Sequence, residues 1–256
     1  MISKSQIKFV QSLKQKRYRE IHRCFVAEGS KLVLELAGSH FLIRQIYASR
    51  DWLSDNALIH EIPIAEVKPG EMERITALST PSPVLAVVGM PEENPEPSCR
   101  KEDLSLMLDG IQDPGNLGTM IRTADWFGIQ QLICSTNCVD LYNPKVIQAT
   151  MGSITRVMVT YLELAEYLAS LEENVPVFGM GLEGENIFGA EITPHGIIVI
   201  GSEAHGISEE VSKFIKHSLA IPFFPADRKQ HAESLNAAVA TGIVCAEFRK
   251  NVRRET

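Results

Sequence analysis

Six short apolar runs, with five segments of helical periodicity between and after them, dominate residues 102–256 of this 256-residue chain. The runs are LSLMLDG, QQLICS, TRVMVTY, VPVFGM, GIIVIG and SLAIPF, which begin at residues 104, 130, 155, 175, 196 and 218. The helical patterns lie at about 116–127, 143–150, 163–172, 208–215 and 233–250. Apolar strands that alternate with helices predict an α/β fold, with a mostly parallel sheet covered on both faces. Because ligands of such sheets bind at the carboxyl ends of the strands, functional residues are expected there.

A proline-rich stretch at residues 91–101, PEENPEPSCRK, contains three prolines and almost no apolar side chains, which is typical of a linker. It predicts a small domain at residues 1–90 and a larger one at 102–256. The smaller segment also alternates, which predicts a small α/β unit. Its expected helices lie at about 4–16, 30–39 and 70–78, its expected strands at 23–29, 41–49 and 82–90, and Ser30 is expected to cap the second helix.

Positive charge is concentrated at the amino terminus, although the whole chain has a net charge of -7. The overall acidity argues mildly against nucleic acid as a partner. Within residues 1–25, however, there are seven Lys and Arg residues, and Glu20 is the single acidic residue. This segment is either a solvated helix face or an RNA-binding arm, with Tyr18 and Phe25 as possible stacking partners. The candidate RNA-binding residues are Lys14, Lys16, Arg17, Arg19 and Arg23.

Several classes of protein are disfavoured by what the sequence lacks. No apolar run reaches the ~18 residues of a membrane span, and the first twenty residues lack the apolar core of a secretory signal. The five cysteines include no CxxC pair and no accompanying histidine cluster, so we expect free, reduced cysteines and no metal site. These features predict a cytoplasmic protein without a membrane partner.

The first strand end, LDGIQDPGNLGTMIRTADWFGI at residues 108–129, leads through a glycine-rich turn into a helix. Asn116 is expected to cap this helix, and Gly128 is expected to end it. Arg122 falls opposite the apolar stripe of the helix and therefore faces away from the sheet. From its position alone, Arg122 either pairs with Asp125 at the surface or serves a function. The glycine spacing matches neither the dinucleotide-binding fingerprint nor the P-loop.

Two later strand ends also carry polar residues. The apolar run at 197–200 leads directly into Gly201 and Glu203, and this carboxylate either contacts a ligand or caps the next helix. After the strand that ends at Pro222, Ser234 and Asn236 begin a helix rich in small residues. That pair fits an ordinary helix cap as well as a functional role.

The segments NLGTMIR, GSEAHG and IP…SLN, in this order, resemble the three signature motifs of the SpoU (TrmH) family of RNA ribose 2'-O-methyltransferases. The resemblance covers residues 102–256, and residues 1–90 resemble the small L30-like substrate-binding domain of many family members. It implies an α/β-knot fold, in which the mostly parallel sheet carries a deep trefoil knot, and it implies a homodimer.

The resemblance also implies S-adenosylmethionine as the cofactor and assigns site residues. The cofactor candidates are Gly201, Ile221 and Leu235, with Met180 and Gly181 as further ones, and the catalytic positions are Asn116, Arg122, Glu203, Ser234 and Asn236. One departure is the loop FFPADRKQHAE at 223–233, which is longer than usual in the family and has no glycine. We therefore expect altered cofactor contacts there. Arg228, Lys229 and His231 are either RNA contacts or part of a solvated loop.

The implied reaction is in-line attack of a ribose 2'-hydroxyl on a sulfonium methyl group, which requires RNA rather than DNA. Arg122 is expected to act as a cation rather than as a base, and to hold a phosphate or stabilise the developing alkoxide. Glu203 and Asn236 would orient the nucleotide or Arg122. Structured ribosomal RNA is the preferred substrate. The alternatives are transfer RNA, or a non-catalytic RNA-binding or ribosome-assembly protein on the same fold.

Overall fold

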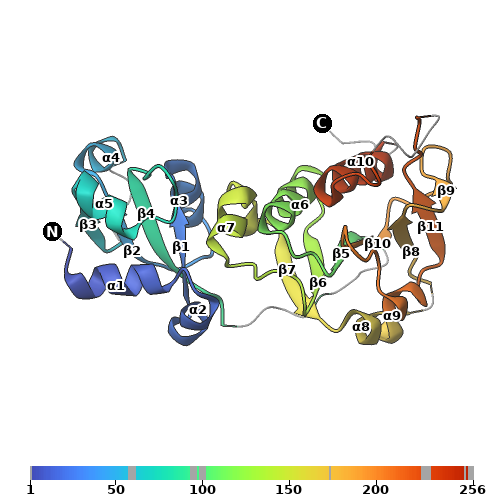
Figure 1. The fold of residues 1–256 in the computed structure, drawn as a ribbon, viewed down its shortest axis with the longest axis horizontal. Helices are drawn as coiled ribbons and strands as arrows, with labels where there is room; N and C mark the ends of the chain where they lie inside the picture. The colour runs from blue at the N-terminus through green and yellow to red at the C-terminus, as the bar shows by residue number, and fades with distance from the viewer. Residues whose placement is uncertain are drawn as a thin grey trace. The chain divides into compact units, whose positions relative to one another are not determined.

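The computed structural model describes residues 2–56, 62–92, 97, 102–172, 174–225, 232–250 and 252, and the chain divides into two compact units. The N-terminal unit comprises Met1–Glu93 together with Asp140–Thr155, and the C-terminal unit comprises Asn94–Val139 and Arg156–Thr256. Each unit is built around one sheet (Figure 1). The domain expected at 102–256 is therefore interrupted, because Asp140–Thr155 belongs to the N-terminal unit. Most of the expected linker at 91–101 lies outside the described residues.

The N-terminal unit has a four-stranded sheet in the order β1-β4-β2-β3. β4 pairs antiparallel with both β1 and β2, whereas β2 and β3 are parallel. The strands are β1 Cys24–Glu28, β2 Ile43–Ala48, β3 Ile64–Glu66 and β4 Val84–Gly89. The helices are α1 Lys4–Ser12, α2 Lys16–His22, α3 Ser30–Ala37, α4 Arg50–Asp55, α5 Pro69–Ile75, α7 Pro144–Thr150 and the 3-10 helix η1 Ser153–Thr155.

Two local expectations for this unit are wrong. The single helix expected at 4–16 is two helices, because the C-cap residue Leu13 is fully buried and Gln15 is extended at φ -100°, which breaks the helix. Ser30 does not cap α3. Gly29 occupies the cap position, and the Ser30 hydroxyl instead accepts a hydrogen bond from Trp52 Nε1 at 2.8 Å.

The inserted segment Asp140–Thr155 packs on the N-terminal sheet through α7, which contacts β1. The ring of Tyr142 lies 4.9 Å from the ring of Phe25, measured between centroids, and both side chains are buried. Phe25 also contacts Phe41 at 5.8 Å in an edge-to-face arrangement. Burial of large aromatic side chains of this kind contributes strongly to core stability, so the inserted segment completes the N-terminal core.

Arg19 also holds the inserted segment. Its Nη2 pairs with Asp140 at 2.5 Å, and its Nη1 donates to the carbonyls of Leu13 and Lys14, each at 2.9 Å. The Arg19 side chain is only 3% exposed. Arg19 was expected to face RNA, and this expectation is wrong, because the side chain is buried in a structural ion pair.

The C-terminal unit has a seven-stranded sheet in the order β7-β6-β5-β10-β8-β11-β9, and every neighbouring pair is parallel. The expected mostly parallel sheet is thus confirmed. The strands are β5 Leu104–Asp109, β6 Gln131–Ser135, β7 Met158–Leu162, β8 Val177–Gly181, β9 Glu185–Asn186, β10 Gly196–Gly201 and β11 His217–Ala220. The helices are α6 Pro114–Trp126, α8 Leu164–Ser170, α9 Glu209–Ser212 and α10 Ala237–Arg249.

Helices cover both faces of this sheet (Figure 1). α6 and α10 pack side by side, and α10 contacts β10. On the other face, Leu164 and Leu168 of α8 and Val211 of α9 form a core cluster with Ile197 and Val199 of β10. Because successive strand residues point to opposite faces, a run of buried aliphatic residues such as β10 serves both layers.

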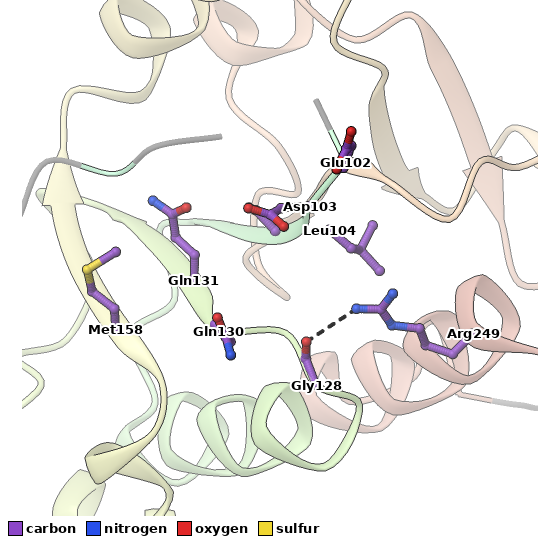
Figure 2. Close-up of a pocket in the computed structure, with 9 residues that line it drawn as sticks. Glu102, Asp103, Leu104, Gly128, Gln130, Gln131, Met158 and Arg249 are labelled. Atoms are coloured by element: carbon purple, nitrogen blue, oxygen red, sulfur yellow. Dashed lines mark hydrogen bonds between the residues drawn. The ribbon is translucent and has the colours of Figure 1, made fainter. Parts of the chain in front are cut away.

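The end of α10 is fastened to the end of α6 by Arg249. Arg249 Nε donates to the carbonyl of Phe127 at 3.0 Å, and Nη2 donates to that of Gly128 at 3.3 Å (Figure 2). A cation at a helix C-terminus satisfies carbonyls that lack helical partners. The trefoil knot implied by the resemblance stays a prediction. Among the described residues, no helix has the length and apolar character to cross a bilayer.

Candidate active site

The carboxyl ends of three neighbouring strands, β10, β8 and β11, form a hollow of about 590 Å³. Met180 and Gly181 end β8, Gly201 ends β10, and Ile221 follows β11. Leu235, just before α10, completes the set. All five residues that the sequence nominated for cofactor binding therefore line one hollow, because parallel strands deliver their carboxyl ends to the same edge.

The remaining lining adds apolar surface and two carboxylates. Sequence reasoning missed most of these residues, although several directly follow the nominated strand ends. Glu183 comes from the loop after β8, and Glu203 from the loop after β10. The other lining residues are Leu182, Ile200, Ser202, Ala204, His205, Gly206, Ser234, Ala237 and Ala240. A mostly apolar hollow with a few charged groups suits a ligand with an aromatic ring and a positive charge.

The loop after β10 is a tight turn that only glycine permits at its first position. Ser202 and Gly206 exchange backbone hydrogen bonds of 3.1 and 2.8 Å, and Gly206 has φ +68°. A Cβ atom on Gly201 would overlap the backbone of Gly206. The absence of a side chain at Gly201 therefore lets the loop fold back and present Glu203 at the rim of the hollow.

Three of the nominated catalytic residues form one hydrogen-bonded cluster. Asn116 Nδ2 donates to Glu203 Oε1, and Asn236 Nδ2 donates to Asn116 Oδ1 at 2.9 Å. Glu203 Oε1 also lies 3.4 Å from the backbone nitrogen of Ala237, the first residue of α10. The three side chains come from α6, the β10 loop and the start of α10, so the cluster joins the three motifs found in the sequence.

The way in which α6 and α10 are capped explains why the side-chain amides of Asn116 and Asn236 can donate hydrogen bonds within the cluster. Asp113, not Asn116, caps α6, and its side chain accepts from the Asn116 backbone at 2.8 Å. The expectation that Asn116 is the cap is wrong, and its amide is thereby free to bind Glu203. Asn236 does cap α10, because its Oδ1 accepts from Ala238 and Val239, while its Nδ2 still reaches Asn116. The alternative that Glu203 caps α9 is wrong, since Ser208 holds that position.

Arg122 and Ser234 stand outside the hydrogen-bonded cluster. Arg122 is exposed on α6, as expected, and no hydrogen bond or ion pair joins it to a described residue. Asp125, its suggested partner, instead pairs with Arg156, whose Nε and Nη2 each lie 2.9 Å from Asp125 Oδ2. The Arg122–Asp125 surface pair is therefore not formed. Ser234 is exposed and lines the hollow.

Both candidate RNA-binding lysines already have a partner within the N-terminal unit. Lys14 Nζ donates to the carbonyl of Thr76 at 2.7 Å, and Lys16 lies 3.8 Å from Glu20 in an exposed pair. Exposed pairs of this kind are weak, so Lys16 can exchange Glu20 for another anion at little cost. Arg17 is exposed.

Arg23 is exposed and lines a separate hollow in the N-terminal unit. Of the two aromatic residues suggested as stacking partners, Phe25 is fully buried and cannot stack on a base. Tyr18 is exposed and stacks on His22 with a centroid distance of 6.4 Å. Arg228, Lys229 and His231 lie outside the described residues, as does most of the atypical loop.

A further hollow, of about 470 Å³, lies at the opposite edge of the C-terminal sheet (Figure 2). The first residues of β5, β6 and β7, namely Leu104, Gln131 and Met158, line it. Glu102 and Asp103 give it negative charge, and Arg249 points toward it from α10. None of the nominated site residues lines this hollow, and it lies at the amino ends of the strands. The candidate active site is therefore the carboxyl-edge hollow.

Within the part of the chain that the structure describes, no three His, Cys, Asp or Glu side chains gather as a metal site. The four described cysteines, Cys24, Cys134, Cys138 and Cys245, are free and buried. Hydrogen bonds from Cys134, Ser135 and nearby backbone amides lower the pKa of Cys138 to about 6, against the opposing effect of burial. This thiol is buried and does not line the candidate active site.

Comparison with known families assigns the two parts of the chain on either side of the proline-rich stretch to two different families. Residues 103–246 match the SpoU rRNA Methylase family, which accounts for more than half of the chain. Residues 4–86 match the MRM3-like substrate binding domain. The first match contains all ten nominated cofactor and catalytic residues.

Individual proteins resemble the chain over nearly its whole length. It is 29% identical to the 23S rRNA (guanosine(2553)-2'-O)-methyltransferase of Bacillus subtilis, over 95% of this chain and 99% of that one. A solved structure of a proposed TrmH-family RNA methyltransferase from Porphyromonas gingivalis is 38% identical, with a TM-score of 0.87 and coverage of 98% and 99%. An AdoMet-bound rRNA methyltransferase from Sinorhizobium meliloti is 25% identical, with a TM-score of 0.85 and coverage of 99% and 97%.

Proposed function

The chain belongs to the SpoU rRNA methylase family, and from this premise we propose that it methylates a ribose 2'-hydroxyl of ribosomal RNA with S-adenosylmethionine as donor. The observation that carries the proposal is the Asn116–Glu203–Asn236 cluster at the rim of a cofactor-sized hollow. The cluster draws on all three strand ends that the sequence singled out. An ordinary packing contact would not require polar side chains from three separate motifs to converge at a hollow.

The chemistry of the hollow fits S-adenosylmethionine. Its volume of about 590 Å³ falls within the usual range for small-molecule sites, roughly 300–1,000 Å³. Met180, Ile221 and Leu235 offer apolar surface for an adenine ring. Glu183 and Glu203 supply negative charge that favours a cationic ligand. When bound, the cofactor supplies an electrophilic methyl group, and its loss of charge on transfer removes the need for a large oxyanion hole.

The protein side chains align and polarise the ribose hydroxyl. Arg122 acts as a cation rather than as a base, and it binds the phosphate next to the target ribose or stabilises the developing alkoxide. Glu203, fixed by Asn116 and the start of α10, orients the nucleotide. Asn236 holds Asn116 in turn, so it acts as a positioning residue. The hydroxyl proton would pass to water, and alignment of the reacting groups accounts for much of the expected rate enhancement.

Ribosomal RNA is the favoured substrate because the B. subtilis relative, which matches over almost its full length, is named for 23S rRNA. The match of residues 4–86 to a substrate-binding domain supports the view that the N-terminal unit binds RNA. A cytoplasmic location, expected from the sequence, accords with this substrate. Transfer RNA is the alternative substrate, and the reaction at a 2'-hydroxyl is the same for both.

A homodimer is part of the proposal. Two large apolar side chains on the packed helices α6 and α10 are solvent-exposed in the single chain, Trp126 at 77% and Val239 at 54%. Single exposed apolar side chains are common on monomers, so the dimer rests on the family resemblance, and these two positions are the ones that we expect it to bury. Sedimentation equilibrium should show a dimer, and Val239→Glu should shift it toward the monomer.

Mapping of ribose methylation tests the proposed reaction. Ribosomal and transfer RNA from cells with and without the gene should differ by one 2'-O-methyl group, located in ribosomal RNA. Loss of a transfer RNA methyl group would move the substrate to that class. Calorimetry with S-adenosylmethionine separates the enzyme from a non-catalytic RNA-binding protein, because absence of binding at millimolar cofactor would favour the latter.

A further inference from the structure

A hollow of about 340 Å³ lies at one edge of the N-terminal sheet, and no residue nominated for catalysis or cofactor binding lines it. Arg23 directly precedes β1, Arg44 lies near the start of β2, and Gly89 ends β4. Cys24 pairs with Gly89, and Ile43 pairs with Val88, so the antiparallel register brings these points to the same edge. The hollow is therefore a product of the sheet pairing rather than of one loop.

The lining carries two exposed arginines and His40 against Glu92 alone. The Arg44 guanidinium lies across the β4 backbone, since a Cβ atom on Gly89 would be 3.4 Å from Arg44 Nε. No hydrogen bond or ion pair joins Arg44 to a described residue. Arg23 Nη2 donates to the backbone carbonyl of Pro91. Both guanidiniums thus keep donors available for an anion, and their planar forks suit phosphate.

Arg23 is held in an unusual backbone conformation. It is one of two non-glycine residues with positive φ among the described residues, at φ 50°. Its carbonyl accepts a hydrogen bond from the Met90 backbone at 2.9 Å. Arg23 is the left-handed C-cap of α2, so this conformation ends the helix and fixes the point from which the side chain extends at the start of β1.

His40 is the exposed end of an aromatic column that runs into the core. Its ring lies 4.6 Å from the ring of Phe41, which contacts Phe25 at 5.8 Å, and Phe25 in turn contacts Tyr142 at 4.9 Å. Phe41, Phe25 and Tyr142 are buried, whereas His40 is exposed. A ring backed on one side by a rigid column and exposed to solvent is a platform on which a base can stack.

We propose that this hollow binds one unpaired nucleotide of the RNA substrate, with the base stacked on His40 and the adjoining phosphates bound by Arg23 and Arg44. The inference rests on the proposed function to the extent that the partner is RNA. It assigns the recognition of RNA by the N-terminal unit to His40, Arg23 and Arg44, of which only Arg23 was expected from the sequence. Cations alone would suit any anion, but cations beside a stacking platform favour single-stranded nucleic acid.

Fluorescence anisotropy with a labelled RNA hairpin that has an unpaired loop tests the assignment across a range of salt concentrations. Arg44→Gln should weaken binding about tenfold and lower the slope of log affinity against log salt by roughly 0.7, the value for one single-strand phosphate contact. His40→Ala should weaken binding about tenfold without changing the slope, because stacking releases no counterions. His40→Phe should restore the affinity.

Arg50→Gln is the matched control, because Arg50 is an exposed arginine of the same unit, on α4, outside the hollow. It should change the affinity less than twofold. Equal effects of Arg44→Gln and Arg50→Gln would overturn the proposal, as would wild-type binding at low salt too weak to measure. So would preference for a phosphopeptide over the hairpin in competition.

Cofactor binding separates this inference from the proposed function. The Arg44→Gln and His40→Ala proteins should bind S-adenosylmethionine as the wild type does, because the cofactor hollow is in the C-terminal unit, whereas Arg44 and His40 belong to the N-terminal unit. If the wild type bound RNA through this hollow but bound no cofactor, the proposed methylation would fail and the RNA site would stand. If the cofactor bound and these substitutions left RNA affinity unchanged, the RNA site would fail alone.

Discussion

In the C-terminal unit, parallel strands bring Met180, Gly201 and Ile221 to one edge, whereas in the N-terminal unit antiparallel strands bring the starts of β1 and β2 beside the end of β4. The first hollow is lined by apolar side chains, glycines and carboxylates. The second is lined by guanidiniums and an aromatic platform. The two hollows thus suit ligands of opposite charge, a cationic cofactor and an anionic polymer.

The difference in sheet geometry decides which hollow a sequence can predict. In a parallel sheet every strand ends at the same edge, so residues after consecutive strands converge. In an antiparallel sheet the neighbours of a strand end are residues that precede other strands. Arg44 and His40 precede or begin a strand, and a search of strand ends does not find them.

The largest expected effect tests whether a cation of the C-terminal unit acts in the reaction. Arg122→Lys should reduce single-turnover methyl transfer by roughly 100-fold or more, because lysine keeps the charge but loses the bidentate fork. Cofactor binding, measured by calorimetry, should be unchanged, since Arg122 does not line the hollow. Near-normal turnover would contradict the assignment and leave Arg122 as an ordinary surface residue.

The next effect concerns a cation of the N-terminal unit that stabilises the fold through a buried ion pair. Arg19→Met should lower the free energy of unfolding by about 2–3 kcal/mol in urea titrations, because it leaves Asp140 without its partner. Arg50→Met, on the exposed surface, should have little effect. In a double-mutant cycle with Asp140→Asn, additive losses would show that the pair contributes no coupling, contrary to this expectation.

A smaller effect is expected at the glycine turn of the C-terminal unit. Gly201→Ala should weaken S-adenosylmethionine binding at least about tenfold, because the new methyl group must displace Gly206 and the loop that carries Glu203. Gly242→Ala is the control, since a Cβ atom there meets open space within α10. Equal cofactor affinity for the Gly201→Ala protein and the wild type would show that the loop position is unimportant.

The smallest effect is expected where α10 is fastened to α6. Arg249→Gln should lower the free energy of unfolding by about 1 kcal/mol, because two charge-assisted hydrogen bonds to helix-end carbonyls are replaced by at most one neutral bond. Lys250→Gln, one residue on, removes a half-exposed charge whose partner within the described part of the chain is Glu247, and should cost less. The reverse order in thermal melts would contradict the capping role.

The six strands expected in the C-terminal unit are all present, because each is centred on an apolar run, and in β5, β6 and β10 almost every residue is buried. The N-terminal unit yielded less to sequence reasoning. α2 and α4 were missed, and β3 has only three residues, none of them buried. Short elements such as these depend on neighbouring elements more than on their own periodicity.

The sequence allowed us to predict which residues belong to the candidate site, but not which hydrogen bonds join them. Asn116 and Asn236 both lie near helix starts, where a capping role is an adequate explanation of each. Only the tertiary structure distinguishes them, because Asp113 takes over the cap of α6 and releases the Asn116 amide to Glu203. Likewise, the positive charge of Arg19 looked like that of its neighbours until Asp140 was brought to it from far along the chain.

The inclusion of Asp140–Thr155 in the N-terminal unit has a consequence for how the protein is made and dissected. The polypeptide passes between the units three times, after residues 93, 139 and 155. During synthesis, Phe25 cannot make its contact with Tyr142 until residue 142 has left the ribosome. By then the residues of β5 and β6 have also been synthesised. Two fragments divided at the proline-rich stretch would therefore each be incomplete: the first would lack Asp140–Thr155, and the second would carry this segment without the sheet on which it packs. The two units are thus expected to fold correctly only as parts of one chain.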